Sequence, residues 1–385
     1  MSSLYLDHNA GSPLRAEALD AMRPLLEHGA ANPSSQHKAG QAARTALELA
    51  RERAAKLLGG WPEEWVFTSG ATEACNMALY GACLAGAAPR PLIVGATEHP
   101  AVLETADALA SAGVAVERLP VNSQGVADLA GLRQALQRHP GAIVALMHAN
   151  NETGVLHPVA EAAALVHGQG GFIFSDLAQS TGKVPVDVRG LDLDLGALSG
   201  TKFGGPQGSG LLYRRKGLRL KPLLHGGHQE FGLRPGTENV AAAVGLAGAL
   251  EAAVGGLNDQ TKAWTLAVDA LESGLRRLLP GLQVHGRGAE RVSNTLSVSL
   301  PGLDRDLLLL RLDQLGLQAS AGAACAAGAA EPSHVLAAMG ASSEAIRTVL
   351  RFSFGPGQGE SEALEALRRL GMAWDGFRAA GLLPG

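Results

Sequence analysis

The segment Leu198–Gly210 reads LSGTKFGGPQGSG and sets Lys202 between small hydroxyl residues and a glycine-rich turn. Upstream, Asp176 ends the apolar run Gly171-Phe172-Ile173-Phe174-Ser175. A lysine amine can form a Schiff base with an aldehyde cofactor, and a carboxylate can keep a pyridine nitrogen protonated so that the ring accepts electrons. Together the two residues predict a site for pyridoxal 5'-phosphate, and hence an enzyme.

Apolar runs alternate with helix-length segments around this stretch, a pattern typical of a mostly parallel sheet with helices on both faces. The predicted strands are Trp65–Thr68, Leu92–Gly95, Val114–Leu119, Ile143–Met147, Phe172–Ser175 and Leu193–Leu198. The predicted helices include Pro13–Glu27, Gln36–Leu58, Glu73–Leu84, Ala101–Ala112 and Val159–His167.

The pattern changes near Gly255, which predicts a second, smaller α/β domain. Its elements are a helix at Asp259–Leu279, a strand at Asn294–Ser299, a helix at Arg305–Leu315 and a strand at Leu350–Phe354. The N-terminal residues are expected to pack near it. We therefore predict a large cofactor-binding domain over residues 15–254 and a small domain built from residues 1–14 and 255–385.

The composition points to a folded protein of the cytoplasm. Of 385 residues 46% are hydrophobic, and the formal net charge is −4 with both signs mixed along the chain. This balance argues against nucleic acid or an anionic membrane as an obligate partner. The N-terminus has no signal-peptide pattern, and the longest apolar run, Val240–Leu250, is short for a bilayer span. Three cysteines favour a reducing compartment without disulfides.

Ser69-Gly70-Ala71-Thr72-Glu73 follows a predicted strand and opens a helix. Free backbone N–H groups at such a position, with the helix dipole, suit a phosphate. The alternative is an ordinary N-cap made by Thr72 or Ser69. The position at the carboxyl end of a parallel strand, where such sheets bind ligands, favours the phosphate.

Several other polar residues have both a functional and an ordinary interpretation. His99, in a strand-to-helix loop, is either a surface residue or a ring that stacks on the cofactor and carries protons. Asn151 belongs either to a plain turn or to a ligand site. Arg351 is either a buried ion-pair partner or a clamp for a carboxylate. Gln179, three residues after Asp176, could reach a ligand hydroxyl, and Thr237 lies in a turn that leads into a helix.

The three cysteines differ in their surroundings. Cys75 and Cys83 lie on a predicted helix and are expected in the core. Cys325 lies in the tract SAGAACAAG, which contains only small residues, and is either structural or a mobile nucleophilic thiol. No metal site is predicted.

The chain resembles the cysteine desulfurases of the class V aminotransferase family, the NifS/IscS type, over nearly its full length. The resemblance depends on nine motifs in order: YLDHNAGSP, FTSGATEACN, TEHPAV, HANNETGV, SDLAQSTGK, LSGTKFGGPQG, GGHQEFGLRPGTENV, SAGAACAAGAAEPSHVL and LRFSFG. It implies fold type I of the pyridoxal-phosphate enzymes, with a mostly parallel seven-stranded sheet and a smaller α/β domain. It also implies a mobile cysteine loop at about 318–332.

The resemblance implies a role for each motif residue. Lys202 would hold the cofactor, Asp176 would face its pyridine nitrogen, His99 would stack on its ring, and Gln179 would contact its phenolic oxygen. The phosphate would be bound by Ala71, Thr72, Ser199 and Thr201, and by Thr237 of a neighbouring subunit in a homodimer. Asn151 and Arg351 would bind the carboxylate of L-cysteine. Cys325 would take the sulfur as a persulfide and pass it to an acceptor protein, such as an iron–sulfur cluster scaffold.

The sequence departs from the family pattern at a few positions, and two other functions stay open. Thr201 stands where a histidine is usual, and Gly11-Ser12 stand where two threonines are common. One alternative function is selenocysteine lyase or another class V reaction. The other is an inactive scaffold that only carries sulfur.

Overall fold

A seven-stranded sheet forms the centre of the larger part of the computed structural model, which describes residues 3–27, 31–279, 281–300, 302, 304–322 and 332–380. The sheet is mostly parallel, as predicted, and β8 runs antiparallel to both of its neighbours. In spatial order its strands are β2 (Trp65–Thr68), β8 (Gly210–Arg214), β7 (Leu195–Ser199), β6 (Phe172–Asp176), β5 (Ile143–Ala145), β3 (Leu92–Gly95) and β4 (Val116–Leu119).

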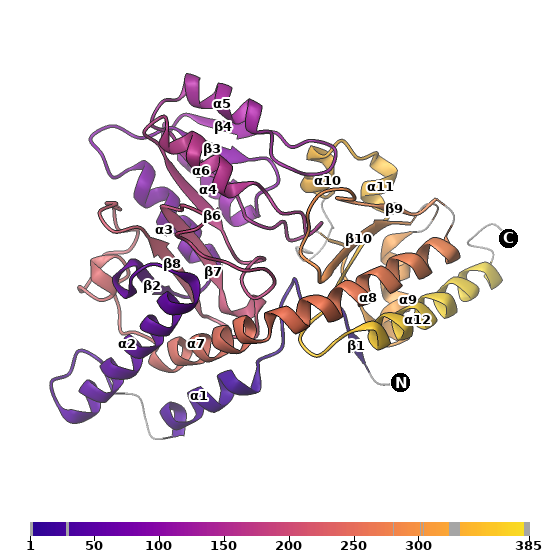
Figure 1. Ribbon diagram of the computed structural model, residues 1–385, viewed down its shortest axis with the longest axis horizontal. Helices are drawn as coiled ribbons and strands as arrows, with labels where there is room; N and C mark the ends of the chain where they lie inside the picture. Colours follow the sequence, from indigo (N-terminus) through magenta and orange to yellow (C-terminus); the bar gives the residue numbers. More distant parts are fainter. Residues whose placement is uncertain are drawn as a thin grey trace.

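Helices cover both faces of this sheet (Figure 1). One face packs against α3 (Ala71–Cys83) and α4 (Pro100–Ser111) in a core that includes Cys75 and Cys83, both buried as expected. The helices on the other face are α1 (Ala16–Glu27), α2 (Lys38–Leu58), α5 (Leu129–Arg138), α6 (Val159–His167) and α7 (Val240–Gly255).

The other end of the molecule has its own hydrophobic core, which includes Leu4 and Leu6 from the N-terminal segment. Two small sheets contribute: β9 (Gln283–Val284), β10 (Thr295–Ser299) and β12 (Val349–Ser353) form one, and β1 (Leu4–Tyr5) and β11 (Leu317–Gln318) the other. The helices of this end are α8 (Leu257–Leu278), α9 (Arg305–Gln314), α10 (His334–Ala338), α11 (Ser343–Arg347) and α12 (Glu360–Ala379).

The predicted element boundaries need small corrections. The first helix starts at Ala16 rather than Pro13, and α2 starts at Lys38, because the His37 side chain caps it by accepting from Gly40 N–H. The strand that begins at Ile143 ends at Ala145, after which the chain turns toward the cavity described below. Short 3-10 turns lie at Pro62–Glu64 (η1), Gly200–Lys202 (η2) and Glu230–Gly232 (η3).

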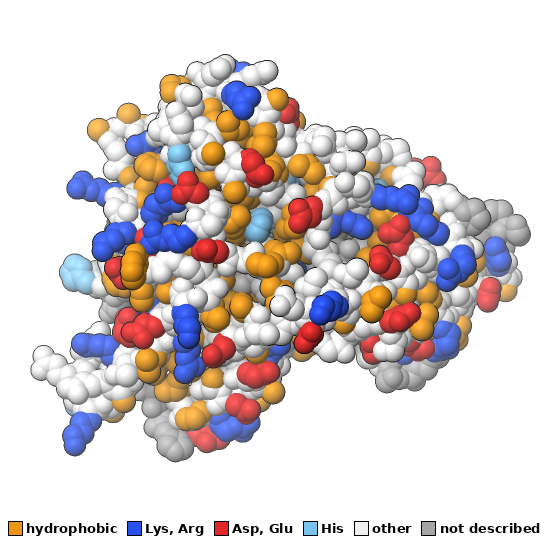
Figure 2. All heavy atoms as spheres, in the orientation of Figure 1, with side chains coloured by type: hydrophobic (Ala, Val, Ile, Leu, Met, Phe, Trp, Pro, Cys, Tyr) orange, Lys and Arg blue, Asp and Glu red, His pale blue; other side chains and the backbone are white. Residues whose placement is uncertain are grey.

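Acidic, basic and exposed apolar side chains are intermixed on the face shown in Figure 2. Within the described ranges, no single helix has the length and apolar character needed to cross a bilayer. The pair α7 and α8 meets these criteria only when taken together, and the two helices meet at an angle of 67°.

Candidate active site

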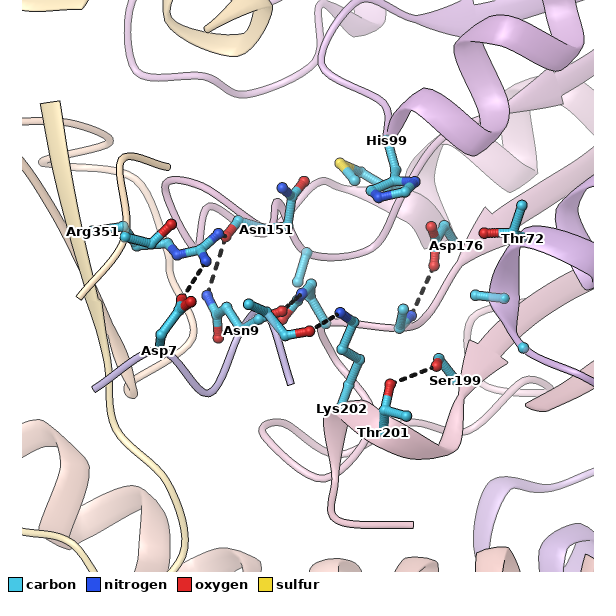
Figure 3. A pocket seen from close by; sticks show the side chains of 18 of the residues that line it. Asp7, Asn9, Thr72, His99, Asn151, Asp176, Ser199, Thr201, Lys202 and Arg351 are labelled. Atoms are coloured by element: carbon cyan, nitrogen blue, oxygen red, sulfur yellow. Dashed lines mark hydrogen bonds and ion pairs between the residues drawn. The ribbon is translucent and has the colours of Figure 1, made fainter. Parts of the chain in front are cut away.

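A cavity of about 700 Å³ lies at the carboxyl ends of the parallel strands, where open α/β sheets bind ligands. Figure 3 shows that its walls come from distant parts of the chain. Ten of the predicted site residues line it: Ala71, Thr72, His99, Asn151, Asp176, Gln179, Ser199, Thr201, Lys202 and Arg351.

Lys202 reaches the cavity from η2, directly after the end of β7. Its Nζ donates a hydrogen bond of 2.7 Å to the carbonyl oxygen of Ala10. Partial burial and the positive charge of Arg351 lower the pKa of this amine, while Asp176 and Asp7 oppose the shift. Such an amine gives up its proton more readily than a solvated lysine and so is a better nucleophile and base.

Asp176 is the last residue of β6, and its side chain is buried at the cavity wall. One of its carboxylate oxygens, Oδ1, accepts a hydrogen bond of 2.8 Å from Ala178 N–H. Burial raises the pKa of this carboxyl, and His99 and Lys202 lower it. A buried carboxylate with so little compensation calls for a cationic partner in the cavity.

His99 precedes α4 and caps it, because its Nδ1 accepts a hydrogen bond of 3.1 Å from Ala101 N–H. Burial is the main cause that lowers the pKa of the ring; Asp176 raises this pKa and Lys202 lowers it, both by less than burial does. Because Nδ1 accepts the hydrogen bond from Ala101 N–H, the neutral ring carries its proton on Nε2. That nitrogen is the one able to donate a hydrogen bond or a proton.

The N-terminus of α3 borders the cavity and presents backbone N–H groups that have no partner within the helix. The alternative interpretation, a side-chain cap by Thr72 or Ser69, is wrong: the capping residue is Gly70, which has no side chain to bond. Gly210 on β8 lies directly against this turn, since a Cβ there would be 2.6 Å from Gly70 Cα.

Two hydroxyl groups face the same part of the cavity from η2 and the end of β7. Ser199 Oγ and Thr201 Oγ1 lie 3.0 Å apart and both line the cavity (Figure 3). Together with the N-terminus of α3, these two hydroxyl groups place several hydrogen-bond donors along one part of the cavity. This is an anion site of the kind that binds phosphate esters.

Arg351 approaches the opposite side of the cavity from β12, and it is buried. Its Nη1 donates to the carbonyl oxygens of Asn151 at 2.8 Å and Gly322 at 3.1 Å. Its Nη2 forms an ion pair of 2.6 Å with Asp7 Oδ1. Of the two interpretations of Arg351, the ion pair is therefore present, and the guanidinium also lines the cavity.

A buried polar network behind the cavity escaped the sequence analysis. Lys183 Nζ donates to Gln179 Oε1 and, at 2.7 Å, to Asn9 Oδ1. Gln179 Nε2 donates to Asn9 O at 2.9 Å, and Asn9 Nδ2 donates to Thr295 Oγ1 at 2.9 Å. Burial lowers the pKa of Lys183 well below its ordinary value. The network fixes the orientation of the Gln179 amide at the cavity wall.

Two predicted residues are not part of this cavity as described. Thr237 is exposed and does not line it, and Cys325 lies outside the described residues. Asp7 and Asn9 line it without having been singled out. Their only sequence signal is the motif YLDHNAGSP, which contains a charged and an amide side chain next to a short strand.

These groups fit pyridoxal phosphate. The Asp176 carboxylate suits a protonated ring nitrogen, the Lys202 amine suits an aldehyde, and the α3 N-terminus with two hydroxyls suits a phosphate ester. The cavity is also within the size range of sites for small cofactors.

Comparisons with known proteins give consistent results. The family described as Aminotransferase class-V matches residues 4–366. The chain is 38% identical to a cysteine desulfurase of Enterobacter agglomerans over 96% of this chain and 92% of that protein. It is 37% identical to the cysteine desulfurase IscS of Dictyoglomus turgidum, over 91% of this chain and 89% of that one. A solved structure described as a NifS-like protein superposes with a TM-score of 0.90 at 34% identity, covering 97% of this chain and 99% of the other.

Proposed function

Because this chain belongs to the class-V aminotransferase family, and to the cysteine desulfurases within it, we propose that its cavity removes sulfur from L-cysteine and releases L-alanine. The fold is that of the type I pyridoxal-phosphate enzymes. The observation that carries the proposal is the presence of the Lys202 amine, the Asp176 carboxylate and the Arg351 guanidinium around one cavity.

Pyridoxal 5'-phosphate, when bound, supplies an electron-accepting ring that stabilises negative charge at the Cα atom of an amino acid. In our proposal Lys202 Nζ holds it covalently and Asp176 keeps its ring nitrogen protonated. His99 would stack on the ring and Gln179 would contact the phenolic oxygen. Its phosphate would be bound by Ala71, Thr72, Ser199 and Thr201.

The substrate would be held through its carboxylate by Arg351 and Asn151. Once the substrate has released it from the cofactor, Lys202 Nζ, with its lowered pKa, would take the Cα proton. His99 Nε2–H would supply or recover a proton on the other side of the cavity, since Nδ1 is engaged by Ala101 N–H. In this proposal, two proton carriers of different type would serve one reacting carbon.

Sulfur would leave through Cys325. A new S–S bond forms between its Sγ and the substrate sulfur while the substrate Cβ–S bond breaks, so that L-cysteine and a thiol give L-alanine and a persulfide. The exchange is balanced without an external oxidant. An acceptor protein, such as an iron–sulfur scaffold, would then take the terminal sulfur.

The remaining parts of the proposal concern assembly. We propose a cytoplasmic homodimer in which Thr237 completes the phosphate site of the partner subunit, and its exposure on this chain is compatible with that role. We also propose that residues 15–254 and residues 1–14 with 255–385 are two domains. Their separate hydrophobic cores support this division.

The test is the conversion of L-cysteine by the purified protein with pyridoxal phosphate and dithiothreitol. We expect equal amounts of L-alanine and sulfide. Lys202→Ala should lose both products, while Lys216→Ala, which removes a side chain that is 72% exposed, should keep them. Cys325→Ser should also stop sulfide release. Turnover that survives in Lys202→Ala would contradict the proposal.

A further inference from the structure

Arg351 has few hydrogen-bond donors left for a ligand. Nη1 already donates to two backbone carbonyls, those of Asn151 and Gly322. Nη2 donates to Asp7, and Nε is buried with no hydrogen-bond partner among the described residues. Since Nε is buried, the donor left for a carboxylate that binds this guanidinium is the second N–H of Nη2, beside the carboxylate of Asp7.

Asp7 is held in this place by its own backbone. It forms a parallel bridge with Ser353, two residues beyond Arg351, and its carbonyl oxygen accepts a hydrogen bond of 3.0 Å from Tyr5 Oη. Its side chain points to Arg351 from the N-terminal segment and lines the cavity (Figure 3). The pair is thus built into the wall and is not an accidental surface contact.

The charge balance at this wall depends on what binds. Arg351 and Asp7 form a neutral pair, so a simple carboxylate that binds Arg351 also meets the negative charge of Asp7. An α-amino acid carries its ammonium group one carbon away from its carboxylate, and this cation offsets the repulsion. Attraction and repulsion over such distances are strong at a partly buried site.

We propose that Asp7 makes the carboxylate site selective for zwitterionic amino acids over simple carboxylates. This inference rests on the proposed function, because it assumes that the substrate carboxylate is bound by Arg351. Asp7 acts through its charge, and it is a specificity-determining residue rather than a proton carrier.

The test compares two ligands of the same size, propionate and L-alanine, which differ in the amino group. Their dissociation constants are measured by calorimetry on the holoenzyme for the wild type and Asp7→Asn. We expect Asp7→Asn to bind propionate on the order of ten- to hundredfold more tightly and L-alanine with a clearly smaller gain. Asp107→Asn, which removes an exposed partner of Arg118, should change neither.

The selectivity role is overturned if folded Asp7→Asn binds propionate no more tightly, or if both ligands gain equally. Should Asp7→Asn fail to fold, Asp7→Ser removes the same charge with a smaller side chain. Failure of both variants to fold would assign Asp7 a structural role and also overturn the proposal. If the wild type makes no alanine from cysteine while Asp7→Asn still tightens propionate selectively, the proposed function fails and the selectivity of this site stands.

Discussion

Glu98, the residue before His99, should carry a proton at neutral pH. It is completely buried, its Oε1 accepts a hydrogen bond of 2.5 Å from Met147 N–H, and its Oε2 has no partner among the described residues. Burial is the main cause that raises its pKa to about 8, and the nearby charge of Asp176 adds to it. A protonated Glu98 leaves Asp176 as the negative group of this wall.

The consequence for stability can be worked out from the two pKa values. The unfolded chain loses this proton near pH 4.5, whereas the folded protein keeps it to about pH 8. The stability that the protonated Glu98 gives the folded protein is complete below pH 4.5. It falls as the pH rises and is lost once the pH has passed the folded-state pKa of about 8. At about 1.36 kcal/mol per pH unit, the loss over this interval amounts to at most ~5 kcal/mol.

Glu98→Gln removes the titration and keeps an acceptor for Met147 N–H. We expect its free energy of unfolding, relative to the wild type, to increase by ~1 kcal/mol per pH unit between pH 5 and pH 8. At pH 5 the variant should be equal to the wild type or slightly less stable, because its amide N–H groups are buried without a partner. Urea denaturation at several pH values measures the difference. A difference that stays constant from pH 5 to pH 9 would refute a protonated Glu98.

Two further predictions concern the frame around the site. Arg51→Ala leaves the Glu230 carboxylate buried without its 2.7 Å partner and should cost ~3–5 kcal/mol in urea denaturation, whereas Arg53→Ala, at an exposed position, should cost under ~0.5 kcal/mol. If both substitutions lower the free energy of unfolding equally, the buried Arg51–Glu230 ion pair does not account for the loss of stability in Arg51→Ala. Gly355→Ala would place a Cβ 1.9 Å from the His8 ring and should lower stability by ~1–3 kcal/mol or more, while Gly371→Ala, inside α12 with open space around it, should raise it by up to ~1 kcal/mol. Thermal unfolding of both glycine variants checks this, and an unchanged Gly355→Ala would show that His8 moves aside freely.

The strands and helices with simple apolar patterns could be predicted from the sequence. The strands Trp65–Thr68 and Leu92–Gly95 and the helix Val159–His167 have the predicted bounds. The pattern missed β8, whose apolar residues are few and lie between a glycine-rich turn and a run of basic residues. It also missed α12, because its buried stripe consists largely of alanines such as Ala363, Ala366 and Ala373.

The residues of the site likewise fall into those that the sequence predicts and those that it does not. Residues at strand ends, such as Asp176, can be located from sequence because the carboxyl ends of parallel strands share one edge of the sheet. The contacts of Asp7 with Arg351 and of Lys183 with Asn9 join residues that are 344 and 174 positions apart. No local pattern predicts such pairs, since they depend on how the N-terminal segment crosses between the two hydrophobic cores.

The pairing of Asp7 with Arg351 has a consequence during protein synthesis. The ribosome must add 344 more residues after Asp7 before its partner exists, and domains generally fold as the chain emerges. A nascent chain that has completed the large sheet therefore still lacks one wall of the cavity. If the proposed function holds, the carboxylate site for the amino acid is therefore completed only when translation is nearly finished.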